Sequence, residues 1–408
     1  MKENGGRLLD KKKIIIIVSI VIAVILIISL IIYFNNRVVL DNSGFTLKDD
    51  LTVNVYSDVK VKDFIKDIDG KVVDNKKINT DELGKVDVEF IYLNKDNKKR
   101  KGTFEVTVKD LEEPLIWLSN SYSARVGDDV NLEDEILCAD NYDSNPSCKI
   151  KGDYDLNTAG NYSLVYEAED SSGNKESVDF ILYVYEPKSV TGGGSSEEVT
   201  STDFNAVLEE HKNKDTLVGI DVSKWQGAID FFKVKEAEAE FVIIRVGHQN
   251  GVGGEYVLDP YFKRNIKEAL ENKLKVGIYF YSYADNKKEA KKQAEWVIKQ
   301  IKDYDITLPI AFDFECFSSF NSMNLSLYDL NEVAETYFST LENKGYDTML
   351  YGSKNYLNAI WKYNTNKVWL AHYTDQTDYD KDYMMWQLCQ DGVIDGINGF
   401  VDIDILYK

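Results

Sequence analysis

The sequence contains little of what metal and phosphate chemistry requires. Its 408 residues include 3 histidines and 4 cysteines, and His211, His248 and His372 lie far apart. None of these residues has the short Cys/His spacing that zinc sites use. The glycines of Gly251–Gly254 are not followed by the Lys-Ser or Lys-Thr pair of a phosphate-binding loop. We therefore predict no metal ion and no cofactor.

Positive charge is scarce as well. Lysine and arginine number 48 against 69 aspartates and glutamates, which gives a formal net charge of −21. Nucleic acids are held chiefly by Lys and Arg on their phosphates, and anionic surfaces attract basic proteins. The sequence therefore predicts no nucleic-acid partner, and a polyanionic partner would have to be recognised by shape and local hydrogen bonds.

Residues 14–34 lack charged side chains altogether and are almost entirely Ile, Val and Leu. As a helix this run would extend roughly 31 Å, about the thickness of a bilayer core. Lys11–Lys13 precede it and only Arg37 closely follows it. The excess of positive charge on the amino-terminal side predicts a cytoplasmic tail at residues 1–13. We expect a single-pass helix in a bacterial cell membrane, in contact with the lipid bilayer, with residues 35–408 outside. The alternative is a cleaved signal peptide, which the length and the lack of a small-residue cleavage site disfavour.

Two similar β modules are predicted next, at residues 45–110 and 115–186. Both alternate Val, Ile, Tyr and Phe with polar residues between Gly, Asn and Asp turns. The second resembles the immunoglobulin-like modules of bacterial surface proteins, and the first a degenerate relative. A spacer role is favoured over ligand binding. Cys138 and Cys148 flank a turn-rich stretch and are predicted to form a disulfide in this extracytoplasmic setting.

A Gly/Ser-rich linker at 187–216 leads to a region, residues 217–408, in which strand and helix patterns alternate. The alternation predicts an α/β, TIM-like barrel with five βα units and three further strands joined by loops or hairpins. The predicted strands are Gly219–Val222, Phe241–Val246, Lys275–Tyr281, Leu308–Phe314, Thr348–Tyr351, Val368–His372, Met385–Leu388 and Val401–Ile405. The predicted helices are 229–240, 260–272, 287–302, 329–344 and 355–361.

Acidic residues stand at the ends of three predicted strands, where the active sites of such barrels lie. Asp221 is at the end of the first strand, Asp313 and Glu315 at the fourth, and Asp402 with Asp404 at the eighth. Asp313 and Glu315 are two residues apart, so on a strand they share a face, away from Phe312 and Phe314. Acids inside a barrel are costly unless they have partners or a chemical role.

Five motifs in order carry a resemblance to a known family. They are Gly219–Gly227 (GIDVSKWQG), Val276–Tyr279 (VGIY), Asp313–Glu315 (DFE), Trp386–Gln387 (WQ) and Gly399–Ile403 (GFVDI). Residues 217–408 resemble the glycoside hydrolase family 25 lysozymes, the Chalaropsis-type muramidases. The resemblance implies a barrel of five βα units and three further strands. It also implies hydrolysis of the β-1,4 bond between N-acetylmuramic acid and N-acetylglucosamine, with peptidoglycan glycan strands as the partner.

The resemblance assigns catalytic roles to the four acids. Glu315 corresponds to the general acid, with a pKa that Asp313 and Asp402 are expected to raise. Asp313 corresponds to the carboxylate that orients the substrate's 2-acetamido group for attack on the anomeric carbon. Asp221 and Asp402 correspond to acids that maintain geometry and protonation, or that serve only structural pairing. Asp404 departs from the family pattern, where many members have Asn.

Aromatic and amide side chains are predicted to bind the sugar. Tyr279 corresponds to a family tyrosine that hydrogen-bonds the acetamido group or the intermediate. Tyr281, Trp225 and Tyr373 lie in predicted strand-to-helix loops or strand ends, where aromatic rings stack on the apolar faces of sugars, and Gln387 belongs to the WQ motif.

Two alternative functions remain beside that of a membrane-anchored muramidase. One is a non-hydrolytic glycan-binding scaffold on a disabled barrel, which the presence of all four acids disfavours. The other is a different glycan enzyme such as a chitinase, which the motif order disfavours. Cys316 and Cys389 are predicted to be unbonded, with Cys316 either a reactive thiol or a buried spectator.

Overall fold

The structure is a computed structural model that describes residues 11–36, 38–117, 121–186, 201–361 and 367–408. The chain divides into two compact units, Met1–Leu111 and Glu112–Lys408. The boundary falls just before the second predicted β module. That module and the barrel therefore belong to one unit.

The first unit contains helix α1 (Lys11–Asn36) and a small β domain. In β6 and β7 the buried residues alternate with exposed ones, which places Val88, Phe90 and Tyr92 in a core with Phe45 and Phe104. The main sheet has the order β1-β7-β6-β5, and β3 also pairs with β7, whereas β2 pairs with β4. The strands are β1 (Val39–Leu40), β2 (Phe45–Leu47), β3 (Thr52–Asn54), β4 (Ile65–Ile68), β5 (Gly70–Val72), β6 (Gly84–Asn94) and β7 (Lys99–Lys109), with a 3-10 helix at Val61–Phe64.

The transmembrane helix predicted at residues 14–34 is not supported. Crossing a bilayer takes about 20 consecutive, mainly apolar residues. Across the side chains that the structure describes, which in α1 are those of residues 16 and 18–29, no helix reaches the length and hydropathy of a membrane span. The prediction of a single-pass protein in a bacterial cell membrane is therefore corrected on this point.

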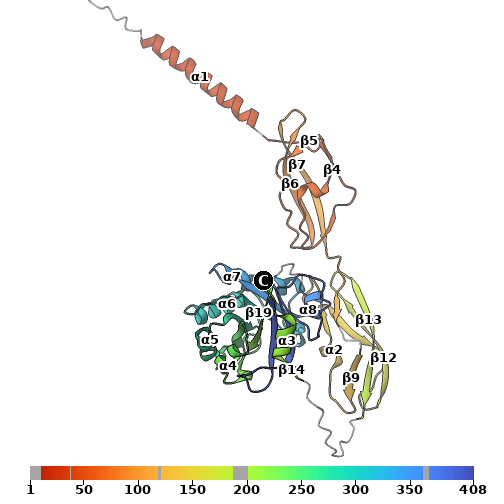
Figure 1. The fold of residues 1–408 in the computed structure, drawn as a ribbon. Helices are drawn as coiled ribbons and strands as arrows, with labels where there is room; N and C mark the ends of the chain where they lie inside the picture. The colour runs from red at the N-terminus through yellow and green to blue at the C-terminus, as the bar shows by residue number, and fades with distance from the viewer. Residues whose placement is uncertain (1–10, 37, 118–120, 187–200, 362–366) are drawn as a thin grey trace, which may run out of the picture. The chain divides into compact units, whose positions relative to one another are not determined.

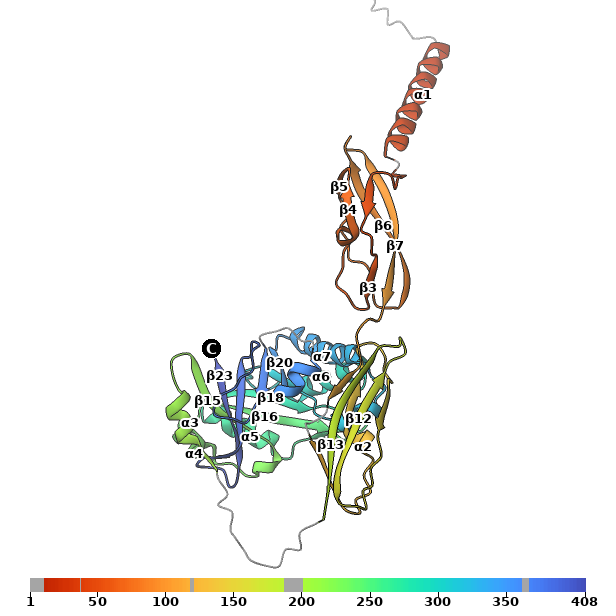
Figure 2. The ribbon, with the colours of Figure 1, turned by 90° about the vertical axis from the view of Figure 1, so that its right-hand side faces the viewer.

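The second unit begins with a β module built from two sheets, seen along β12 and β13 in Figure 2. Four strands pair in the order β11-β12-β13-β9, and β10 pairs with β8. A disulfide between Cys138 of β10 and Cys148 of β11 joins the two sheets, with 6.4 Å between the Cα atoms. The elements are β8 (Leu115–Trp117), β9 (Ser121–Arg125), α2 (Leu132–Glu135), β10 (Leu137–Ala139), β11 (Ser147–Lys151), β12 (Gly160–Glu169) and β13 (Lys175–Tyr185).

Eight strands of the same unit close into a ring. Neighbours are parallel from β15 to β22, and β23 pairs with both β22 and β15. The parallel strands therefore all end at one mouth of the barrel, where loops can bring their side chains together. In ring order the strands are β15 (Thr216–Val222), β16 (Phe241–Gln249), β18 (Lys275–Tyr281), β19 (Ile310–Asp313), β20 (Thr348–Ser353), β21 (Val368–Ala371), β22 (Met385–Val393) and β23 (Val401–Tyr407).

The sheet contains two strands more than the predicted TIM-like barrel of eight, because β14 (Thr202–Asp203) pairs with β22 and β17 (Tyr256–Leu258) pairs with β16. Of the loop or hairpin connections predicted between the last strands, the final one is a hairpin, and β23 runs antiparallel to both of its neighbours. Residues 394–400 are too few for the crossover of a dozen or more residues that a parallel connection needs, so the chain returns as a hairpin.

Helices cover the outside of the ring, as Figure 1 shows for α5, α6 and α7. Phe312 of β19 packs against Tyr337 and Phe338 of α7, with ring centroids 5.0 and 6.1 Å away. Because side chains alternate along a strand, this contact leaves Asp313 facing the barrel interior. The helices that follow β15, β17, β18, β19 and β20 are α4 (Phe231–Glu236), α5 (Phe262–Glu271), α6 (Lys287–Ile301), α7 (Leu327–Glu342) and α8 (Lys354–Ala359).

The barrel begins earlier than the predicted boundary at residue 217. Residues 187–200 of the predicted linker lie outside the described residues, but β14 and helix α3 (Phe204–His211) follow them. Phe204 and Val207 of α3 are buried in the barrel's apolar core. Residues 202–211 therefore belong to the barrel rather than to a linker.

The β module packs directly on the barrel. Leu137 and Ala139 of β10 share one apolar core with Phe320 and Leu325, which lie between β19 and α7. The backbone N–H of Leu327, at the start of α7, donates to the carbonyl of Asp140 at 2.7 Å. Apolar burial and this hydrogen bond make the module a support for the segment that follows β19.

This packing predicts that the barrel is less stable without the module. A fragment of residues 201–408 would expose the apolar side chains that Leu137 and Ala139 cover, so its thermal unfolding midpoint should be several degrees below that of a 112–408 fragment. Calorimetry of both fragments checks this, with the full chain as the control for the barrel transition. Equal midpoints in the two fragments would show that the contact contributes nothing.

Candidate active site

Four carboxylates meet in one cavity at the mouth of the barrel. Asp221 lies near the end of β15 and Asp313 at the end of β19, with Glu315 two residues later. Asp402 lies at the start of β23, directly opposite Asp221 in the antiparallel pairing. All four line a cavity of about 220 Å³. The four predicted acids therefore line one cavity, and Asp402 reaches it from the start of its strand because β23 runs antiparallel to β15.

Asp221 is buried and oriented by an amide. It is 5% exposed, and its Oδ2 accepts a hydrogen bond from Gln387 Nε2 at 2.7 Å. Gln387 Oε1 in turn accepts from the hydroxyls of Tyr351 and Tyr373, at 2.9 and 3.1 Å. Burial, followed by the charges of Asp402 and Asp404, raises the pKa of Asp221 well above its usual range. Its neutral form is therefore favoured.

Asp313 presents a carboxylate oxygen with no protein partner. Its side chain is buried, and among the described residues no group hydrogen-bonds to its Oδ1. Burial and then the Glu315 charge raise its pKa, while the Arg245 guanidinium opposes the rise. An oxygen of this kind is free to accept a hydrogen bond from a ligand in the cavity.

Glu315 lies just beyond β19 at the mouth of the cavity. The residue as a whole is exposed, yet protein groups surround the carboxyl end, and their desolvation is the largest cause of its raised pKa. The Asp402 charge is the second cause. The predicted contribution of Asp402 is thus observed, whereas Asp313 is not among the causes acting on Glu315. A glutamate whose pKa is raised stays protonated at higher pH than an ordinary glutamate, which suits proton donation.

Asp402 and Asp404 occupy the same face of β23, two residues apart. Burial raises the pKa of Asp402 to about 6. Asp404 is fully buried below it, and its Oδ1 accepts from Trp369 Nε1 at 2.8 Å. The sequence placed Asp404 on the eighth strand with Asp402 but assigned it no catalytic role. Its spacing from Asp402 is the signal that places both acids in the barrel interior.

Aromatic rings form much of the wall. Tyr279, Tyr281 and Trp225 line the cavity, and Trp225 is 76% exposed at its rim. Tyr373 does not line it, but reaches it through its hydrogen bond to Gln387. Two aromatic residues that sequence reasoning did not assign to the site also line the cavity, Tyr351 at β20 and Trp369 at β21.

A buried ion pair was also missed. Arg245 of β16 lines the cavity and donates from Nε and Nη2 to Asp259 Oδ2, at 3.0 and 2.8 Å. Asp259 is almost completely buried, so its guanidinium partner is fixed in direction. The available signal was an arginine within the otherwise apolar predicted strand Phe241–Val246.

The two remaining cysteines are free and buried. Burial raises the pKa of the Cys316 thiol to about 12 and that of Cys389 to about 11. Thiols with pKa values this high are almost entirely protonated at neutral pH, so they are poor nucleophiles. Cys316 fits the buried spectator rather than the reactive thiol.

Taken together, the cavity offers one proton donor at its mouth and one open carboxylate oxygen beneath it. Perturbed acids of this kind are typical of general acid–base catalysis on a ligand that enters between them. The aromatic rim adds apolar surface for a ring-shaped ligand.

Comparison with known sequences concerns the barrel. Residues 220–397 match the sequence family described as Glycosyl hydrolases family 25. The chain is 29% identical over 196 residues to the uncharacterized protein YegX of Escherichia coli K12, a match that covers 47% of this chain and 69% of that protein. It is 27% identical over 195 residues to the autolytic lysozyme of Clostridium acetobutylicum, which covers 46% of this chain and 55% of that protein.

Two solved structures are similar at low identity. The modular autolysin LytC of Streptococcus pneumoniae, in complex with a synthetic peptidoglycan ligand, is 18% identical with a TM-score of 0.44, over 87% of this chain and 77% of that one. A family 25 glycosyl hydrolase from Bacillus anthracis is 20% identical with a TM-score of 0.42, over 53% of this chain and 95% of that one.

Because the pKa of Asp402 is raised, we predict that the free energy of unfolding falls as the pH rises from about 3.9 to about 6. An acid whose pKa is higher in the folded state than the ordinary value of about 3.9 stabilises the fold while protonated and loses this contribution as pH rises past about 6. Chemical denaturation at pH 4.5, 6 and 7.5 should show this decline, and Asp402→Asn should reduce it by roughly 1–3 kcal/mol. An unchanged pH dependence in the variant would contradict the assignment, with Asp179→Asn on the surface of β13 as the control.

Proposed function

We propose that the chain is a peptidoglycan muramidase, because residues 220–397 match the glycosyl hydrolases family 25 and resemble an autolytic lysozyme. The proposed reaction is hydrolysis of the β-1,4 bond between N-acetylmuramic acid and N-acetylglucosamine. The proposed substrate is the glycan strand of peptidoglycan.

One observation carries the proposal. Glu315, with a raised pKa, shares a single cavity with Asp313, Asp221 and Asp402. Glycosidic bonds break through a cationic transition state, which requires a proton for the leaving oxygen and negative charge near the sugar ring. The four acids supply both within one sugar-sized site.

In the first step Glu315 donates its proton to the glycosidic oxygen. As the bond from the anomeric carbon to that oxygen breaks, the carbonyl oxygen of the substrate's own 2-acetamido group forms a bond to the anomeric carbon. Glu315 is left as a carboxylate, which can take a proton from water in the second step. The water then attacks the anomeric carbon and reopens the ring formed by the acetamido group.

Asp313 is proposed to assist the acetamido group. Its Oδ1 lacks a protein partner, so it is available to accept the acetamido N–H and to stabilise the positive charge that develops on the group. Arg245 favours the ionised form of Asp313 against burial and the Glu315 charge. This route needs no enzyme nucleophile, which separates it from the two-carboxylate scheme.

Asp221, Gln387 and Tyr279 are proposed to fix the geometry of the site. The Gln387 amide links Asp221 to Tyr351 and Tyr373. The pKa of Tyr279 is raised by burial and then by the Asp221 charge, so its hydroxyl remains a hydrogen-bond donor. A donor held in this position suits the acetamido group or the cyclic intermediate.

The rim is proposed to hold neighbouring sugars. Trp225 is largely exposed beside the cavity, and the Tyr281 ring packs near Tyr283 with centroids 5.4 Å apart. Exposed aromatic faces of this kind bury the apolar faces of sugar rings, whereas the polar edges hydrogen-bond with the acids. A non-hydrolytic scaffold would use the same rim, so activity assays must separate the two functions.

Replacing the proposed acid gives the direct test. Glu315→Gln removes the proton donor and retains the shape, so release of reducing ends from purified peptidoglycan should fall by about 10²–10⁴-fold. Mass spectrometry of the products from the unmodified protein should identify the cleaved bond. Glu335→Gln, on the exposed face of α7, is the matched control and should keep full activity.

Circular dichroism and the unfolding midpoint of Glu315→Gln should remain those of the unmodified protein. Activity retained in Glu315→Gln would show that the acid is misassigned. No release by the unmodified protein between pH 4 and 8 would favour the scaffold function.

The pH profile tests the link between Glu315 and Asp402. Activity should decline with rising pH as Glu315 loses its proton, with the decline above the ordinary glutamate pKa of about 4.3. Asp402→Asn removes a negative charge that raises the Glu315 pKa, so the declining limb of kcat/KM should move to lower pH. A limb that stays in place or moves to higher pH would contradict the coupling, and Asp179→Asn should leave the profile unchanged.

A further inference from the structure

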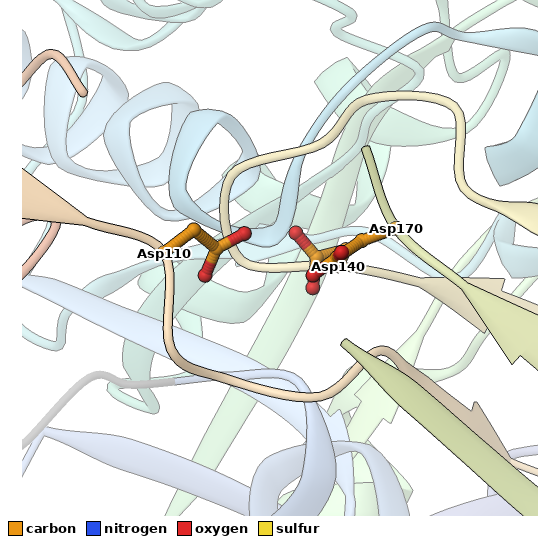
Figure 3. A group of neighbouring side chains, drawn as sticks. All are labelled: Asp110, Asp140 and Asp170. Atoms are coloured by element: carbon orange, nitrogen blue, oxygen red, sulfur yellow. The ribbon is translucent and has the colours of Figure 1, made fainter. Parts of the chain in front are cut away.

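A second pair of buried acids lies outside the barrel, at one end of the β module. Asp140 directly follows β10 and Asp170 directly follows β12. Figure 3 shows both side chains, and one carboxylate oxygen of each lies within 4.8 Å of the other. Asp140 is 0% exposed and Asp170 is 5% exposed. The proposed muramidase reaction makes no use of either residue.

One carboxylate oxygen of Asp140 accepts hydrogen bonds, and the other does not. Its Oδ2 accepts from the backbone N–H groups of Tyr142 and Asp143, at 2.8 and 2.7 Å. Its Oδ1 is buried and has no hydrogen-bond partner among the described residues. Burial of a carboxylate oxygen without a hydrogen-bond donor is unfavourable, so such an atom points to an unassigned ligand.

Asp170 is held in place without being neutralised. Its Oδ1 accepts from the backbone N–H of Asn174 at 2.8 Å, and its Oδ2 from the Asn174 side-chain amide at 2.7 Å. These donors are uncharged. Burial is the largest cause of the raised pKa of Asp140, and the neighbouring Asp170 charge adds to it. In the described part of the chain neither acid forms an ion pair with a basic side chain, and two such like charges favour a cation between them.

We propose that Asp140 and Asp170 form a binding site for a calcium ion. Calcium binds oxygen ligands at 2.3–2.6 Å, so two oxygens no more than 4.8 Å apart can ligate the same ion. Each carboxylate oxygen has a second lone pair, and those already bonded to N–H groups remain able to coordinate. Oxygens up to 4.8 Å apart suit the longer calcium–oxygen distances better than magnesium, which demands near-ideal octahedral geometry at shorter distances.

An ion bound at this site would stabilise the contact between the module and the barrel. The backbone carbonyl of Asp140 accepts from the N–H of Leu327, and that of Asn141 from the N–H of Tyr328, at 2.7 and 3.3 Å. Both donors lie in the first turn of α7, which the segment after Glu315 leads into. An ion bound to Asp140 would therefore stabilise the loop that supports this helix end.

The first experiment uses the full chain after removal of divalent ions with a chelator. Adding calcium should raise the thermal unfolding midpoint of the unit that holds the module by about 2–4 °C, with saturation in the range of about 0.1–10 mM that weak extracellular calcium modules show. Magnesium at the same concentrations should give a smaller rise. No response to calcium up to about 10 mM overturns the proposal.

The second experiment compares matched variants of equal charge. Without calcium, Asp140→Asn should be at least as stable as the unmodified protein, because it removes the repulsion with Asp170. With calcium, the order should reverse, since the variant loses the calcium-dependent rise. Asp179→Asn, an exposed acid of β13 in the same module, should keep that rise in full.

Two outcomes count against the site. A calcium response that survives unchanged in both Asp140→Asn and Asp170→Asn would place the ion elsewhere. A midpoint that ignores calcium but increases as the pH is lowered, and does so only when Asp140 is present, would show that a shared proton occupies the pair instead.

Discussion

The burial of several carboxyl groups in one small cavity is the constraint on which the catalytic barrel depends. Asp221, Asp313, Asp402 and Asp404 lose hydration without gaining enough positive charge to offset the loss. Burial therefore raises their pKa values, although the Arg245 guanidinium opposes the rise at Asp313. At the mouth, desolvation and the Asp402 charge also raise the pKa of Glu315. The proposed proton donation to a ligand depends on this placement of the acids.

A rigid frame is needed to keep such groups together, because they repel each other when ionised. The ring of strands supplies it from within, through the Gln387 amide on Asp221 and the Trp369 indole on Asp404. The Arg245–Asp259 pair adds a fixed positive charge beside Asp313. From outside, the β module packs against the segment between β19 and α7, so it is a structural part of the barrel's surroundings and more than a spacer.

Buried carboxylates that repel each other when ionised occur at two places in this unit, and their surroundings differ. In the barrel, acids at a mouth open to ligand have raised pKa values, and the proposed reaction uses a proton held there. In the module, Asp140 and Asp170 are enclosed and accept hydrogen bonds from backbone or amide N–H groups. The proposed calcium ion would neutralise this pair and make the loop more rigid.

The order of strands and helices, the inward direction of Asp313 and the motifs of the barrel could be predicted from the sequence. These are local properties, set by periodicities of about 2 and 3.6 residues. Glu315, predicted on the same strand face as Asp313, lies instead just beyond the end of β19. The tertiary structure places Asp402 opposite Asp221, and it brings Arg245, Tyr351 and Trp369 to the same cavity. It also decided against the predicted membrane span and joined Asp140 to Asp170. The physical reason is that alternation along a strand tells which face a side chain occupies, whereas neighbours across the sheet depend on closure and register.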